Sequence, residues 1–234
     1  MANDDKWAEL GHWSDVAGGL KLYLAYLIVL VSFTAVTVVA SILIAMSGKT
    51  SALDSLMTLA RISAIVGLGI AVLGLYALAR YARVAPETGA RGSAQTSLVL
   101  GLISFLIAAF GVIRILGASD IDAVGATTAI DIIGRIIGVV QFFALIISLR
   151  TVAGYIGRLD LHGLAGTVML LAGITVALAV MSQLVASGRA APMVLLLGIA
   201  TLGIGIWCLV MLILLLTRLA RAVMSDVQLP QAFS

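Results

Sequence analysis

Six long apolar segments, each almost free of charged residues, constrain the fold of this chain more than any other feature. Each is close to the ~20 residues that an α-helix needs to cross the ~30 Å hydrocarbon layer of a membrane. The connecting segments are short, so 234 residues leave no room for a second, soluble domain. The apolar segments are Leu20–Met46, Ile62–Ala79, Thr96–Leu116, Ile130–Leu149, Leu164–Val185 and Met193–Thr217.

The composition agrees with a membrane location. Hydrophobic residues make up 62% of the chain and charged residues 11%, whereas a soluble domain carries about 25% charged residues. We therefore predict an all-α integral membrane protein with six transmembrane helices. Its expected parts are a cytoplasmic or interfacial N-terminal segment (1–19), the transmembrane domain (20–217) and a cytoplasmic tail (218–234).

The basic residues predict the orientation of the helices. Six spans place both termini on one side, which carries nine lysines and arginines against four on the other. Because cytoplasmic loops hold the excess of positive charge, both termini are expected in the cytoplasm. The Ala-, Arg- and Gly-rich, Lys-poor composition is typical of a high-GC bacterium, which points to its inner membrane. The basic residues lie at helix ends, so the net charge of +3 does not indicate nucleic-acid binding.

Two patterns predict side chains at the membrane interface. Apolar residues recur every three to four positions from Trp7 to Leu20, which favours a short amphipathic helix that ends at Gly18–Gly19. A disordered tail is the alternative. Aromatic rings prefer the headgroup zone, so the tyrosines are expected to form a belt at the cytoplasmic boundary. They are Tyr23, Tyr26, Tyr76, Tyr81 and Tyr155.

Short matches between helices are consistent with an internal repeat. The segment 78–82 resembles 152–156 at an offset of 74 residues and 219–223 at an offset of 141. The chain is therefore either three tandem two-helix hairpins or a set of membrane helices that match by chance, because such helices draw on few residue types.

Small residues mark candidate helix-packing faces, since they let backbones approach closely in lipid. One stripe runs along the second apolar segment, and a G-x-x-x-G pair lies in the fourth. These faces serve either packing within the chain or association with a partner. The residues are Ala60, Ala64, Gly67, Ala71, Gly74, Gly134 and Gly138.

Arg135 is the one formal charge well inside an apolar segment. Its side chain leans toward the outer surface, and Asp131, four residues earlier, is its expected partner. Two interpretations of the nearby charges remain open: a single outer-leaflet cluster that binds an anionic lipid or a solute, or separate structural pairs. The candidate cluster is Arg61, Arg114, Asp120, Asp122, Asp131 and Arg135.

No catalytic, cofactor or metal motif stands out, and no acidic residue lies in the middle of a span. Gln141 and Ser148 are the candidate polar groups at membrane depth. We expect a non-enzymatic accessory, scaffold or assembly subunit of a membrane complex, whose partners are membrane lipids and other membrane subunits or further copies of itself. The alternatives are a small transporter or channel for a weakly polar or anionic solute, lined by Gln141, Ser148 and Arg135, or an enzyme subunit that acts on lipid or quinone.

Overall fold

The computed structural model of the chain describes residues 2–47, 52–118, 129–186 and 191–228. In these ranges the chain forms six long helices, one short 3₁₀ helix and no strand. The elements are α1 (Ala2–Met46), α2 (Ala52–Tyr81), η1 (Pro86–Thr88), α3 (Arg91–Gly117), α5 (Ala129–Tyr155), α6 (Leu159–Ala186) and α7 (Ala191–Gln228).

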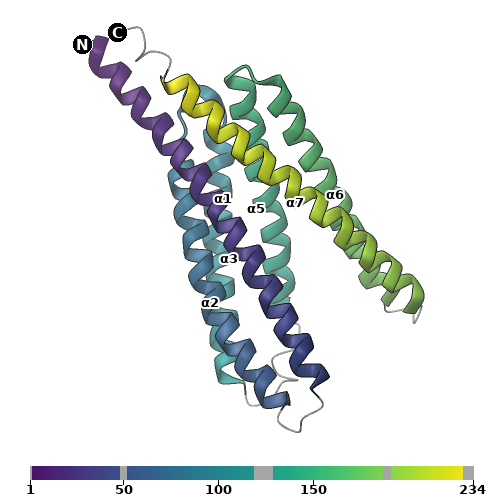
Figure 1. Cartoon of the computed structure of the whole chain (residues 1–234). Coiled ribbons are helices and arrows are strands. Elements are labelled where there is room, and N and C mark those ends of the chain that lie inside the picture. Colours follow the sequence, from purple (N-terminus) through teal and green to yellow (C-terminus); the bar gives the residue numbers. More distant parts are fainter. Residues whose placement is uncertain (1, 48–51, 119–128, 187–190, 229–234) are drawn as a thin grey trace.

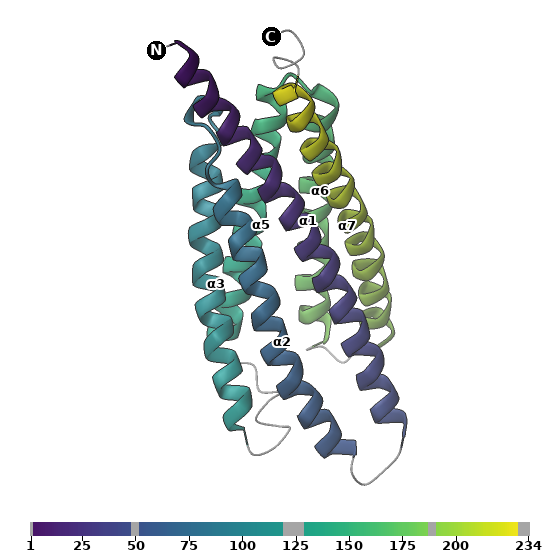
Figure 2. The same cartoon turned by 60° about the vertical axis from the view of Figure 1, so that its left-hand side comes forward.

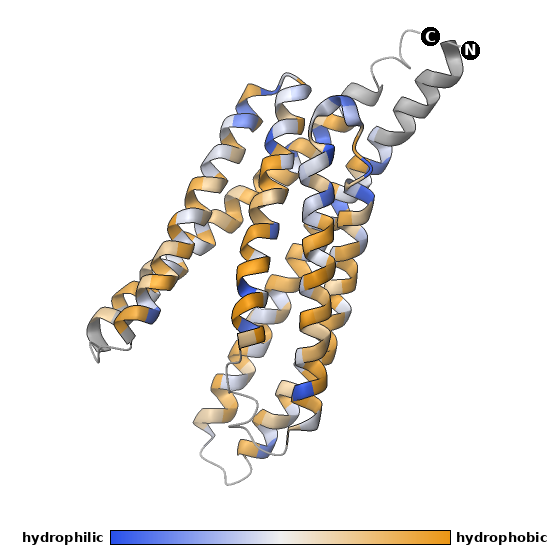
Figure 3. Ribbon diagram, turned by 180° about the vertical axis from the view of Figure 1, so that it is seen from behind, coloured by the Kyte–Doolittle hydropathy of each residue, from blue (hydrophilic) through white to orange (hydrophobic). Residues whose placement is uncertain are grey.

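Each of the six long helices contains a stretch that is long and apolar enough to cross a membrane. Figure 3 shows hydrophobic positions along the middle of the helices and hydrophilic positions mainly toward their ends. This confirms the prediction of an all-α, multi-pass membrane protein with six spans.

The helices run up and down as three antiparallel hairpins, formed by α1 with α2, α3 with α5, and α6 with α7 (Figures 1 and 2). Each helix contacts the next one in the chain, and α7 also contacts α1, so the six form a closed ring of neighbours. The chain begins and ends at the same end of the bundle, which we call the terminal side, and the opposite end is the far side. This arrangement is compatible with three tandem hairpins, whereas the sequence repeat itself stays a prediction.

The side chains that the structure describes as buried lie toward the terminal side of each long helix. On α1 none beyond Leu27 is buried, and on α5 none precedes Ala144. The same holds on α7 before Cys208 and on α6 after Ala172. The helices therefore share a close-packed core near the terminal side, while their far-side halves turn apolar side chains outward, as expected of surfaces that face lipid.

Helix α1 continues without a break through Gly18–Gly19, so the prediction of a separate helix ending there is wrong. A Cβ added at Gly19 would stand 2.6 Å from the backbone nitrogen of Tyr81. The two glycines thus allow α1 to cross α2 closely rather than ending a helix. At the other end α7 continues past Thr217, and Leu219 and Val223 are buried there.

The predicted tyrosine belt is wrong for Tyr23 and Tyr81, which are 9% and 1% exposed. Tyr76 and Tyr155 are 57% and 53% exposed, as a belt requires. The difference has a simple cause: Tyr23 and Tyr81 lie on the faces by which α1 and α2 pack into the bundle. Position along the chain alone does not reveal which face of a helix a tyrosine occupies.

Candidate functional site

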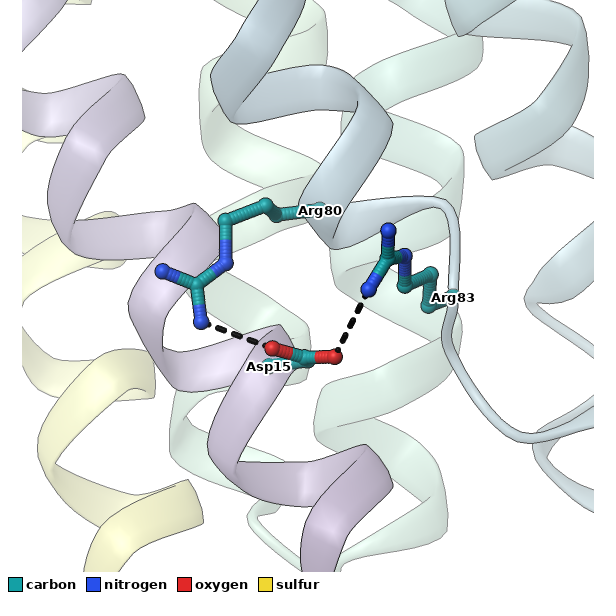
Figure 4. Close-up of polar contacts among 3 residues, drawn as sticks. All are labelled: Asp15, Arg80 and Arg83. Carbon is teal, nitrogen blue, oxygen red and sulfur yellow. Dashed lines mark hydrogen bonds and ion pairs between the residues drawn. The ribbon is translucent and has the colours of Figure 1, made fainter.

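Ion pairs join α1 to the end of α2 at the terminal side. The Asp15 carboxylate accepts hydrogen bonds from Arg80 Nη2 at 2.7 Å and from Arg83 Nη1 at 3.2 Å (Figure 4). Arg83 lies just beyond α2, so one carboxylate holds both the helix and the turn that follows it. This arrangement fastens the terminal-side ends of the first hairpin.

A buried hydrogen-bond chain lies deeper on the same side. Tyr81 Oη and Ser148 Oγ are 2.8 Å apart, and Ser148 donates to the carbonyl of Ala90 at 3.2 Å. Because the single Ser148 proton goes to Ala90, Tyr81 is the donor to Ser148. Ser148 is fully buried and ties α2, α5 and the start of α3 together, so it has a structural role rather than facing a solute.

A further contact on this side joins α5 to α6. Arg150 Nε donates to His162 Nε2 at 3.0 Å, and the other ring nitrogen of His162 lies 3.2 Å from the Arg150 carbonyl oxygen. Together with the contacts of Asp15 and Tyr81, this pair holds successive helices against one another, so the terminal side is closed by polar contacts as well as by its apolar core.

A small chamber of about 180 Å³ lies between α1, α2, α3 and α5, farther from the chain termini than this closed end. Ser104 and Gln141 lie midway along α3 and α5, so the chamber sits near the middle of these two helices. Two tyrosines of α1 complete its polar wall. The polar side chains that line the chamber are Tyr23, Tyr26, Ser104 and Gln141.

Among these four groups, the Ser104 hydroxyl is buried without a hydrogen-bond partner, and the side chains of the other three make no hydrogen bond within the described part of the chain. Three are hydroxyls and one is an amide, so each can both donate and accept. Buried polar groups are normally paired with protein or with ordered water. The chamber therefore presents unused hydrogen-bonding capacity, without a formal charge, at membrane depth.

Glycines give the chamber its shape. A Cβ at Gly101 would stand 3.0 Å from Gln141 Nε2, and one at Gly74 would stand 2.9 Å from the ring of Tyr26. Gly74 belongs to the predicted small-residue stripe, so this part of the stripe packs within the chain. Gly134 does the same, since its Cβ would stand 2.9 Å from Ile107.

The rest of the predicted packing faces is less tightly filled. A Cβ at Gly67 or Gly138 would meet nothing within 4 Å. Ala60, Ala64 and Ala71 are half-buried.

A second, larger cavity of about 530 Å³ lies between α1, α5, α6 and α7. We call it the lateral cavity. Its wall is almost wholly apolar, and Arg135 is the one charged residue that lines it. It shares no lining residue with the chamber, so the two are separate sites.

The predicted outer cluster is divided by the structure into separate contacts. Arg114 Nη1 lies 3.1 Å from Asp131 Oδ2, which joins α3 to α5, and Arg61 donates to the carbonyl of Ala118 at 2.8 Å. Arg135 makes no ion pair within the described ranges, in contrast to its expected pairing with Asp131. The reason is that Arg114 reaches Asp131 from the neighbouring helix, while Arg135 lines the lateral cavity. Asp120 and Asp122 lie outside the described residues.

Sequence reasoning identified Gln141 as a polar group at membrane depth and missed the two tyrosines beside it. Their i, i+3 spacing was the available signal, because it places Tyr23 and Tyr26 on one face of α1. Among the described residues, no group of three or more His, Cys, Asp or Glu is placed to hold a metal ion. No protein-family model, curated protein or solved structure that was compared with the chain matches it.

Proposed function

We propose that this membrane protein binds a small, uncharged polar solute in the chamber and lets it pass between the two sides of the membrane. The observation that carries the proposal is the set of four polar side chains around a cavity near the middle of the helices, one of which, Ser104, has a buried hydroxyl without a hydrogen-bond partner in the described part of the chain. Such groups are costly to leave unsatisfied in a membrane interior, so a ligand or water that pairs with them is favoured there.

The chemistry of the chamber supports a neutral solute. No charged side chain lines it, and an ion without a counter-charge is strongly disfavoured at this depth. The volume of about 180 Å³ corresponds to roughly six water molecules at ~30 Å³ each. A polyol or an amide of a few heavy atoms fits both the size and the hydrogen-bonding groups.

The uneven packing of the bundle supports access from the far side. The closed core and the contacts of Asp15, Tyr81 and His162 lie between the chamber and the terminal side. Passage therefore requires the terminal side to open, in the way that a substrate site becomes accessible to each side in turn.

The test is solute uptake into liposomes that contain the full chain, followed by stopped-flow light scattering with glycerol and urea as probes. We expect uptake above that of protein-free liposomes, and a loss of most of the excess in Gln141→Leu. Gln183→Leu is the matched control, because Gln183 is exposed on α6 and does not line the chamber. Uptake equal to that of protein-free liposomes would reject the proposal.

A second candidate is an accessory or assembly subunit of a membrane complex, as expected from the sequence. On the far-side part of α7, no described side chain before Cys208 is buried, and Leu202, Ile206 and Trp207 are all exposed. Such a surface accepts either lipid or the helices of another subunit. Gentle extraction followed by mass spectrometry of co-purifying proteins separates the two, and a lone monomer would argue against this role.

The orientation and location are proposed on the sequence alone. The excess of basic residues at the terminal side supports cytoplasmic termini, and the composition supports a bacterial inner membrane. Reporter fusions at either end that are active only in the periplasm are expected to be inactive.

A further inference from the structure

We propose that the lateral cavity binds one anionic phospholipid from the far-side leaflet, with its headgroup at Arg135 and an acyl chain between α5, α6 and α7. The volume of about 530 Å³ falls within the ~300–1,000 Å³ of typical ligand sites. This inference does not depend on solute passage, because the lateral cavity and the chamber have no lining residue in common.

The wall of the cavity fits an acyl chain. Thr175 Oγ1 already donates to the carbonyl of Leu171 at 2.8 Å, and Cys208 Sγ donates to the carbonyl of Val168 at 3.7 Å. These two side chains therefore have no donor left for a ligand. An occupant must be apolar along most of its length.

The cavity has a closed end and a charged end. Leu27, Ala172 and Leu212 line it and are buried, which places its floor toward the terminal-side core. Arg135 lies at the other end, eight residues before Phe143, or about 12 Å along α5 at ~1.5 Å per residue. Because the N-terminus of α5 is at the far side, the Arg135 side chain leans toward the headgroups of that leaflet.

The charge at this end favours an anion. Asp131, the nearest acidic residue on α5, is paired with Arg114, and Arg135 has no ion pair within the described residues. A lipid phosphate supplies the missing counter-charge through charge-assisted hydrogen bonds to the guanidinium. An acyl chain with a phosphate at one end thus matches the apolar wall and the single cation together, and the surrounding membrane supplies it at the depth of Arg135.

The test uses the full chain in nanodiscs of phosphatidylcholine, phosphatidylglycerol and palmitate, followed by native mass spectrometry of the lipids that stay bound. We expect one retained phosphatidylglycerol, preferred over phosphatidylcholine by about fivefold, the scale of one basic residue beside an anionic headgroup. Arg135→Gln should reduce this preference to about equal retention.

Gly138→Leu provides a second variant that does not alter charge. Gly138 lines the cavity and has open space at its Cβ, so leucine should occupy the place of the acyl chain and reduce retention of either phospholipid. Gly67→Leu is the matched control, because Gly67 has the same open space but lies outside the cavity. Equal retention of both phospholipids by the wild type, palmitate in place of phospholipid, or unchanged binding in both cavity variants would overturn the inference.

Discussion

Gly19 on α1 lies so close to Tyr81 on α2 that a Cβ at Gly19 would stand 2.6 Å from the Tyr81 backbone nitrogen. At no other described glycine would an added Cβ stand so close to a neighbouring atom. The contact between Gly19 and Tyr81 sits beside the ion pairs of Asp15 and at the edge of the buried core, where α1 and α2 must remain in register.

Gly19→Ala is therefore expected to destabilise the protein. The new methyl group meets backbone, which can move only with its helix, so we expect a loss of about 1–3 kcal/mol in the free energy of unfolding. Gly18→Ala, on the same helix, should cost less, because its Cβ would meet the Arg80 guanidinium at 3.0 Å, which can shift at the expense only of its partly exposed ion pair with Asp15. Thermal unfolding in detergent, followed by circular dichroism, measures both variants, and equal effects would contradict the close crossing.

Gly18–Gly19 also shows where sequence reasoning succeeds and fails. The spans were predictable because hydrocarbon thickness sets the length of an apolar helix. The glycine pair predicts a helix end, but the same sequence pattern also allows two helices to cross closely. Only the position of α2 distinguishes the two. The same limit applies to Arg135 and Asp131: their spacing predicts a pair, whereas in the structure Arg114 reaches Asp131 from another helix.

The hydrogen-bond chain of Tyr81 and Ser148 predicts an unequal pair of substitutions. Ser148→Ala leaves the buried Tyr81 hydroxyl without its acceptor, which should cost about 1–3 kcal/mol. Tyr81→Phe should cost less, about 0.5–1.5 kcal/mol, because Ser148 keeps its bond to Ala90. The double variant should be less destabilised than the sum of the two losses. Additive losses in thermal unfolding would mean that the hydroxyls do not interact.

Gly74 and Gly67 provide a test of chamber packing on one helix. Gly74→Ala brings a methyl group against the ring of Tyr26, so we expect a loss of about 1–3 kcal/mol and displacement of a chamber tyrosine. Gly67→Ala meets nothing within 4 Å and should be neutral or stabilising by up to ~1 kcal/mol, since alanine favours the helix. Solute uptake should fall in the first variant and stay unchanged in the second.

Asp15→Asn tests the closure of the terminal side. It weakens both ion pairs to α2 and the turn after it, and the side chain is about one-third exposed, so the loss of stability should stay below ~1 kcal/mol. Solute uptake should nevertheless rise, because the contact restrains opening. Asp160→Asn is the control, since Asp160 pairs with Arg158 two residues away and joins no separate helices. An equal rise in both variants would point to a general loss of charge rather than to a gate.

Arg114, Asp131 and Arg135 allow the structural pairing to be tested against the pairing predicted from spacing. Both side chains of the Arg114–Asp131 pair are nearly one-third exposed, so each single substitution to Gln or Asn should cost less than ~1 kcal/mol. The coupling is more informative than the size of each loss. Arg114→Gln and Asp131→Asn should be non-additive because they remove the same interaction, whereas Arg135→Gln and Asp131→Asn should add. Coupling in the second double-mutant cycle but not in the first would place Asp131 against Arg135 and would remove the free cation on which the lipid site depends.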